Sequence, residues 1–209
     1  AMQSQYERML SEFAEYLETA QTKLSSDEIS ARDLPHLEQQ LSAHKAFFAD
    51  LESHRTLLEA LQQKVDPSTR QRLLATHTSR VNSSHVIQDK AAFRGQQLDR
   101  LCSQWADFHA NYSDINLWLE RLERRMPAPT GDTDTLEEIR SKVWDFHSMQ
   151  NALSERKADV YDVLDKGRQI LQAVSCTGLD EEVQSFSDRW AQLNSDVDSS
   201  LKRCVNCYN

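Results

Sequence analysis

The fold is decided by residues 98–122, which read LDRLCSQWADFHANYSDINLWLERL. Apolar side chains recur in this segment at alternating steps of three and four residues, at Leu98, Leu101, Trp105, Phe108, Tyr112, Ile115, Leu119 and Leu122. This spacing places them on one face of an α-helix. Because no glycine, proline or cluster of capping residues interrupts the segment, we expect one continuous helix through the middle of the chain.

Features of the first half of the chain return in the second half. Two aromatic anchors return 102 residues later and one histidine returns 103 residues later, pairing Tyr6 with Phe108, Tyr16-Leu17 with Trp118-Leu119, and His44 with His147. A period of this length in a helical sequence is typical of two copies of one supersecondary unit. It is not typical of a single globular enzyme.

Three helices are expected in each copy. Apolar stripes and capping signals place those of the first copy at 3–24, at 34–65 and from 67 onward, and those of the second copy from Leu98 to Leu122, at 136–174 and from 179 onward. Polar or proline-containing segments separate them, namely 25–33, Asp66-Pro67, 126–131 and the turn at 175–178.

The predicted fold class is all-α, with two left-handed antiparallel three-helix bundles in series. Heptad stripes on three successive antiparallel helices favour such a bundle, because each helix buries one seam against the other two. The bundles are expected at 1–105 and 106–209, joined by the continuous helix. We expect that joint to make a stiff rod on the order of 100 Å long.

The third helix of the first copy has the weakest pattern. Asn82-Ser83-Ser84-His85 interrupts its apolar stripe, and Gly95 costs up to about 1 kcal/mol relative to alanine in a helix. We therefore expect this segment to be the softest part of the chain and the first copy to be unstable on its own.

The composition narrows the class of partner. The net charge is −9, and the segment 106–209 carries 19 Asp and Glu against 12 Lys and Arg. Such an acidic surface disfavours nucleic acid, anionic membranes and purely electrostatic binding to acidic filaments such as actin. No apolar run approaches the length of a membrane span. We expect a monomer that binds neither nucleic acid nor membrane directly. The opening Ala1-Met2 is typical of an expression-vector remnant, so we expect a piece of a longer protein.

The chain resembles tandem spectrin repeats along its whole length. The resemblance is carried by the aromatic–leucine pairs Tyr16-Leu17 and Trp118-Leu119, by the histidines that follow them, and by Trp190, which lies 72 residues after Trp118. The first copy departs from the family pattern, because Tyr16 replaces a tryptophan and the expected second tryptophan position falls near Ile87-Gln88. Divergence of this kind is similar to that in giant cytoskeletal linkers: nesprins, which we favour, dystrophin-like proteins and spectraplakins.

The resemblance implies a structural, non-catalytic role. Members of these families use repeat rods as spacers and as docking surfaces, so the implied partner is a cytoskeletal regulator, such as an actin-regulating formin or a motor adaptor. The implied location is cytoplasmic and cytoskeletal, with a parent protein anchored at the outer nuclear membrane. The alternative is a self-associating coiled-coil module, in which the weak helix after residue 67 exchanges between chains.

No catalytic, cofactor-binding or metal-binding site is predicted. Cys204 and Cys207 have metal-like spacing, but no other cysteine and no histidine lies near them in sequence, and a zinc site needs about four ligands. The cysteines are spread along a long helical chain, which favours a reducing compartment. Glycine-rich phosphate loops and nucleophile motifs are absent from the sequence.

The aromatic residues divide into core and candidate surface positions. The expected structural core includes Tyr16, Leu17, Trp105, Phe108, Trp118, Leu119, Phe186 and Trp190. Trp144 lies off its stripe, because Val143 and Phe146 already satisfy the buried face. An exposed aromatic is a natural anchor for a protein partner, although Trp144 covering the edge of its own bundle remains the alternative. Phe47, beside Phe48, is a second candidate of the same kind.

Overall fold

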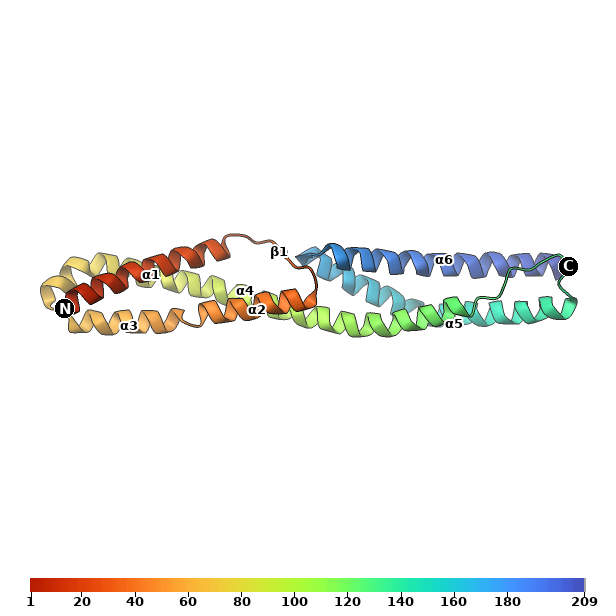
Figure 1. Cartoon of the computed structure of the whole chain (residues 1–209), viewed down its shortest axis with the longest axis horizontal. Coiled ribbons are helices and arrows are strands. Elements are labelled where there is room, and N and C mark those ends of the chain that lie inside the picture. The colour runs from red at the N-terminus through yellow and green to blue at the C-terminus, as the bar shows by residue number, and fades with distance from the viewer. Residues whose placement is uncertain (209) are drawn as a thin grey trace. The chain divides into compact units, whose positions relative to one another are not determined.

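The computed structural model of the chain describes residues 1–208 and is helical almost throughout (Figure 1). The helices are α1 (Met2–Leu24), α2 (Leu34–Phe48), α3 (Leu51–Lys64), α4 (Pro67–Arg124), α5 (Leu136–Ala173) and α6 (Thr177–Tyr208). Two extended segments of two residues each, β1 (Ile29–Ser30) and β2 (Val174–Ser175), precede α2 and α6, respectively. The all-α fold class is confirmed, and the continuous helix expected through residues 98–122 lies within α4.

The chain divides into two compact units, Ala1–Cys102 and Ser103 onward. The first unit contains α1, α2, α3 and the beginning of α4, and the second contains the end of α4 together with α5 and α6. Helix α4 therefore serves both units (Figure 1).

Helix starts follow the capping chemistry of the sequence. Asp33 accepts a hydrogen bond from the backbone N–H of His36 at 2.8 Å ahead of α2, and Thr135 accepts one from Glu138 at 3.1 Å ahead of α5. At the start of α4, Asp66 accepts from the backbone N–H of Thr69 at 3.2 Å. These side chains satisfy backbone donors that the first turn of a helix leaves unpaired.

Buried positions recur at 102 residues through both units. In α1 and the end of α4 the buried pairs include Tyr6 with Phe108 and Leu17 with Leu119, and in the next helices they include Leu37 with Ile139 and Leu58 with Val160. We call two residues 102 positions apart equivalent. The two units are thus built on one pattern of buried faces, and each serves as an internal reference for the other.

The second predicted helix of the first unit is not continuous. The range 34–65 is divided into α2 and α3, which end and begin on either side of Ala49-Asp50. The hydroxyl of Tyr16 donates a hydrogen bond to the carbonyl of Phe47 at 2.7 Å, at the last turn of α2. A side-chain donor from α1 thus satisfies a backbone carbonyl at the point where the helix is interrupted. The apolar stripe of residues 34–65 did not indicate this interruption.

Two finer expectations are corrected. Helix α6 begins at Thr177, inside the turn predicted at 175–178. Ser84, assigned to the interruption of the apolar stripe, is fully buried, whereas the nearby apolar residue Val86 is 54% exposed. Ser84 is held there by a hydrogen bond from Arg55 at 3.2 Å.

The two histidines used to align the halves are not equivalent. His44 is half-buried and its equivalent is the fully buried Phe146, whereas His147 is exposed. The Nε2 atom of His44 lies 2.8 Å from the carbonyl oxygen of Ala91 in α4. His44 is therefore a packing residue between α2 and α4, whereas His147 lies one position beyond the equivalent of His44 and is exposed.

Candidate docking site

The predicted core residues lie mainly inside the units. Six of them are buried, namely Leu17, Trp105, Phe108, Leu119, Phe186 and Trp190, and two are half-buried, namely Tyr16 and Trp118. The half-buried pair is equivalent, so both units place a large aromatic ring at the same edge of the bundle. Burial, together with the negative charge of Asp50, raises the pKa of Tyr16 to about 12, so its hydroxyl stays a donor at neutral pH.

Phe47 lies against the core of the first unit. Its ring stacks on that of Tyr16 at a centroid distance of 5.0 Å, and the ammonium of Lys23 lies 4.9 Å from the same ring centroid. Phe47 is half-buried by these contacts. Most of its surface is already used within the unit, so it offers less area to a partner than its position in the sequence indicated.

The edge around Trp118 is covered in a similar way. The guanidinium of Arg156 in α5 lies 5.0 Å from the Trp118 ring centroid, and the Trp118 and Trp190 rings are 6.3 Å apart. Nearby, Arg189 donates to the Glu123 carboxylate at 2.6 Å and to the Asn116 side chain at 2.7 Å. The bond to Glu123 raises the pKa of Arg189. These contacts join the end of α4 to α5 and α6.

Trp144 is the most exposed large hydrophobic side chain among those that the structure describes in the second unit. It lies on α5 and is 76% exposed, whereas Phe146 is fully buried and Val143 packs against the Phe146 core. Its equivalent in the first unit is Ser42, which is also exposed. The fold therefore accommodates a small polar side chain at this position, and Trp144 is not required to cover the bundle.

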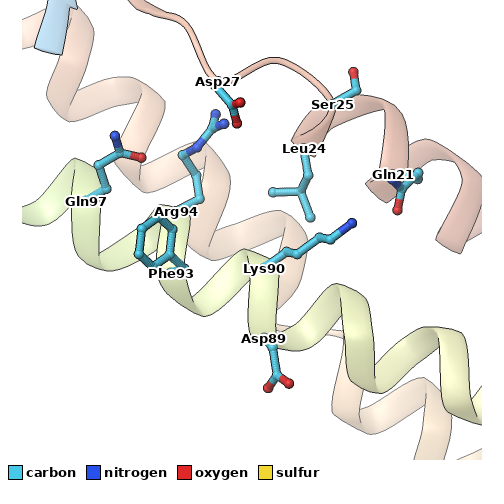
Figure 2. Close-up of a pocket in the computed structure, with 9 residues that line it drawn as sticks. All are labelled: Gln21, Leu24, Ser25, Asp27, Asp89, Lys90, Phe93, Arg94 and Gln97. Atoms are coloured by element: carbon cyan, nitrogen blue, oxygen red, sulfur yellow. The ribbon is translucent and has the colours of Figure 1, made fainter.

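A second exposed aromatic, which the sequence reasoning did not identify, lies on α4 in the first unit. Phe93 is 71% exposed and borders a hollow of about 600 Å³ between the end of α1 and α4 (Figure 2). Leu24, Lys90 and Arg94 also line the hollow. A signal was present in the sequence, because the equivalent residue in the second unit is the polar Ser195.

The described part of the chain contains no candidate metal site. Within residues 1–208, no group of three or more His, Cys, Asp or Glu side chains is placed to hold a metal ion. Cys204 is buried, with its sulfur 2.9 Å from the hydroxyl oxygen of Thr130, whereas Cys207 is exposed. No helix among the described residues is both long enough and apolar enough to cross a membrane.

Comparison with known proteins decides the family. The model of the spectrin repeat matches residues 1–107, which is half of the chain. The chain belongs to the spectrin repeat family. The match lies on the copy whose aromatic residues depart from the expected pattern, so that repeat keeps the family signature despite Tyr16 and the absence of a tryptophan near Ile87-Gln88. The spectrin repeat is a structural, non-catalytic module.

Relatives of this spectrin-repeat chain are giant proteins. Human nesprin-2 is 24% identical over 202 residues, covering 96% of the chain, and mouse nesprin-2 is 25% identical over 196 residues, covering 93%. Mouse microtubule-actin cross-linking factor 1, isoforms 6/7, is 26% identical over 212 residues, also covering 93%. The chain spans only 3% of the length of either nesprin-2 and 6% of the cross-linking factor. It is thus similar to a short spectrin-repeat segment of such proteins.

Proposed function

We propose that the chain is a structural segment of a nesprin-like cytoskeletal linker, which spaces other parts of its parent and docks a cytoskeletal regulator on Trp144. The regulator we favour is an actin-regulating protein such as a formin, with a motor adaptor as the other member of the class. The similarity to nesprin-2 over almost the whole chain supports the linker role. In this proposal the parent protein lies in the cytoplasm and is anchored at the outer nuclear membrane.

The exposure of Trp144 carries the docking part of the proposal. Tryptophan is enriched among residues that contribute most to protein interfaces, because it buries a large area with little loss of side-chain freedom. At 76% exposure, most of this area remains available. The exposed Ser42 at the equivalent position indicates that the repeat itself has no need of the ring.

Affinity purification with a matched pair of variants tests the proposal. Wild type, Trp144→Ser and Leu117→Ser are used as bait against cytoskeletal extract, and formins, other actin regulators and motor adaptors are quantified by mass spectrometry. Leu117 is the control because it is an exposed apolar residue of the same unit, at 50% exposure. We expect Trp144→Ser to lower recovery of one such regulator by about tenfold or more, and Leu117→Ser to leave it unchanged.

Two results would contradict the docking part. Equal recovery by Trp144→Ser would show that the ring is not the anchor. Failure of all three baits to retain a regulator would leave spacing as the role of the segment. Thermal melts of each variant, followed by circular dichroism, separate a lost contact from a lost fold.

Self-association is the second candidate, and one observation favours it. Among the residues that the structure describes, Arg80 Nε and Gln88 Oε1 in α4 are buried without a hydrogen-bond partner. Unsatisfied buried groups weaken packing and would favour exchange of this part of α4 between chains. Sedimentation velocity over a wide concentration range distinguishes the candidates, because helix exchange predicts a sedimentation coefficient that rises with concentration.

A further inference from the structure

The first unit has a hollow beside the interruption between α2 and α3. It has a volume of about 390 Å³ and is bordered by these two helices and by α4. We call it the Gln88 hollow. The side chains that line it include Phe48, Leu51, Gln88, Ala91, Ala92 and Gly95. A space of this volume is large enough to receive a large side chain from another molecule.

Small residues on α4 leave this space open. Three of the α4 residues that line the hollow are smaller than their equivalents in the second unit. The pairs are Gln88 with Trp190, Ala91 with Leu193, and Gly95 with Val197. All three residues of the second unit are buried. The first unit therefore has less side-chain volume than the second between the same helices, and missing volume in a close-packed bundle remains as a hollow.

Two groups beside the hollow have contacts still to make. Among the residues that the structure describes, the Oε1 atom of Gln88 is buried without a hydrogen-bond partner, which costs free energy. The last torsion of a glutamine side chain is soft, so this amide can turn its oxygen toward an occupant. The ring of Phe48 is half-buried, so part of it remains available. An aromatic ring that carries an N–H donor would satisfy both groups.

Charge does not select the occupant of this hollow. One cation, Lys45, and one anion, Glu52, also line it, and both side chains are exposed. The ammonium of Lys45 lies 4.0 Å from the carboxylate of Asp99. With one charge of each sign at the hollow, the space and the apolar wall favour an uncharged ring.

An exposed tryptophan of the same chain has these properties. Trp144 in the second unit is 76% exposed, and its equivalent Ser42 indicates that the repeat fold has no need of the ring. Indole is aromatic and uncharged, and its nitrogen is a hydrogen-bond donor only. An exposed apolar group and a complementary pocket elsewhere on one molecule produce a head-to-tail contact between copies of that molecule.

We propose that the Gln88 hollow of one copy of the chain receives Trp144 of a second copy. The ring packs against Phe48 and Leu51, and the indole N–H donates to the side-chain oxygen of Gln88. Each copy has one ring and one hollow, so the contact joins copies head to tail. No helix leaves its own bundle, which separates this contact from helix exchange.

This self-association goes beyond the docking of a regulator, because the partner is the chain itself. The same ring cannot occupy a regulator and the hollow at once, so the two contacts compete. The experiment below contains no regulator, and its failure would leave the regulator proposal to its own test.

Sedimentation velocity of the full chain tests the proposal from about 10 μM to about 1 mM, where a contact made by one side chain is expected to form. Wild type is compared with Trp144→Ser, which removes the ring, and with Ala92→Glu, which places a charged side chain at an exposed position on the wall of the hollow. Gln88→Trp fills the hollow with the residue of the second unit. Leu117→Ser, at another exposed apolar position of the second unit, is the control.

The sedimentation coefficients of wild type and Leu117→Ser are expected to rise with concentration. Each of the other three variants is expected to raise the dissociation constant about tenfold or more. Circular dichroism melts check the fold of every variant. Ala92→Glu keeps the test valid if Gln88→Trp fails to fold, because Ala92 is exposed.

A mixture of two variants provides the most specific test. Trp144→Ser retains the hollow without the ring, and Ala92→Glu retains the ring with an obstructed hollow. Each is expected to remain a monomer alone, and an equimolar mixture is expected to form one-to-one pairs. A fluorescent label on the α-amino group of one variant shows the pairs in the mixture.

Three results would overturn the proposal. The first is a wild-type sedimentation coefficient that stays constant over the whole concentration range. The second is association that Trp144→Ser leaves unchanged, which would assign it to helix exchange. The third is association that Trp144→Ser removes but Ala92→Glu and Gln88→Trp retain, which would place the ring on another surface of the second copy.

Discussion

At the residue level, the first unit has a buried polar pair where the second has an apolar one. The hydroxyl of Tyr6 and the Nδ1 atom of His77 are 2.7 Å apart and both side chains are buried. Their equivalents are Phe108 and Leu179, which are buried and carry no polar side-chain atom. Burial lowers the pKa of His77, with the carboxylate of Glu59 opposing the shift, and burial raises the pKa of Tyr6, with Arg70 opposing it.

This pair predicts a pH-dependent stability of the first unit. Because the folded pKa of His77 lies below its unfolded value near 6.5, the unfolded chain binds more protons below that pH. Stability is therefore expected to fall as the pH drops from 7.5 to 5.5, by at most about 1.4 kcal/mol per pH unit for one group.

The double variant Tyr6→Phe, His77→Leu, which copies the second unit, isolates this contribution. It removes both hydrogen-bonding partners together, so it leaves no buried polar atom unpaired at this site and is expected to fold. Urea unfolding of both proteins at the two pH values is the measurement. An equal loss of stability in wild type and variant would show that other groups carry the pH dependence.

Two of the helical glycines, Gly95 in α4 and Gly167 in α5, are expected to respond in opposite ways to alanine. A Cβ atom on Gly95 would lie 3.4 Å from His44 Nε2, an ordinary contact, whereas one on Gly167 would lie 2.9 Å from both Phe108 and Val183. Gly95→Ala should raise the free energy of unfolding by up to about 1 kcal/mol through helix propensity. Gly167→Ala should lower it by about 1–3 kcal/mol through overpacking. Chemical denaturation measures both, and a change of the same sign in the two variants would contradict the packing argument.

At the level of elements, the interruption between α2 and α3 is the main departure from a regular repeat. Ala49 and Asp50 both have backbone angles near the right-handed helical region, so the interruption is a local break and not a loop. The equivalent residues 151–152 lie inside the unbroken helix α5. One unit thus has a divided helix where the other has a continuous one.

Hydrogen exchange should reveal this difference directly. We expect the backbone amides of residues 51–53 to exchange faster than those of residues 153–155, because helix starts lack intrahelical acceptors for their first amides. Exchange followed by NMR on the whole chain provides both sets of rates in one sample. Equal protection at the two sites would mean that Tyr16 and its neighbours restore full helix stability at the break.

Element boundaries were predictable where a local signal sets them. Asp33, Asp66 and Thr135 are capping residues, and each stands immediately before a helix. The break at Ala49 was not predictable, because neither glycine nor proline marks it and the apolar stripe continues across it. Its clearest feature is the bond from Tyr16, which lies 31 residues away in sequence. Contacts of this kind depend on the packed structure.

At the level of the whole molecule, the tryptophans provide a probe of one unit. Trp105, Trp118, Trp144 and Trp190 all lie in the second unit, whereas helices of both units contribute to circular dichroism. The first unit buries His77, Arg55 and Ser84, and polar groups in a core contribute less stability than apolar ones. We therefore expect the dichroism signal to begin to fall at a lower urea concentration than the tryptophan emission changes.

Simultaneous urea titrations of the two signals test this expectation. Coincident transitions would show that the units unfold as one cooperative system. The same titration also bears on the expectation, drawn from the sequence, that the first unit is unstable alone. The structure changes the physical reason for that expectation. Gly95 is packed under His44 and Ser84 is hydrogen-bonded, so the polar core now accounts for the expected weakness.

The candidate sites were predictable only in part, for a physical reason. Trp144 could be identified because it lies off a regular stripe that Val143 and Phe146 already fill. Phe93 escaped notice because the stripe around it is irregular, so no residue there stands out as misplaced. Its exposure depends on Ile87 and Ala91, which form the buried face of α4 at that level. The comparison of equivalent residues recovers it, once the structure sets the period at 102.

The sharing of α4 between two units has a consequence for the gene. Because equivalent positions recur at 102 residues, a deletion of 102 codons replaces each residue after the splice by its equivalent in the other unit. The order of buried and exposed positions along the helices is then kept. A loss of 100 codons would also keep the reading frame, but it would rotate one side of a helical splice by about 200° relative to the other, since each residue advances an α-helix by about 100°. Of two deletions of nearly the same length, only the first would leave a foldable protein.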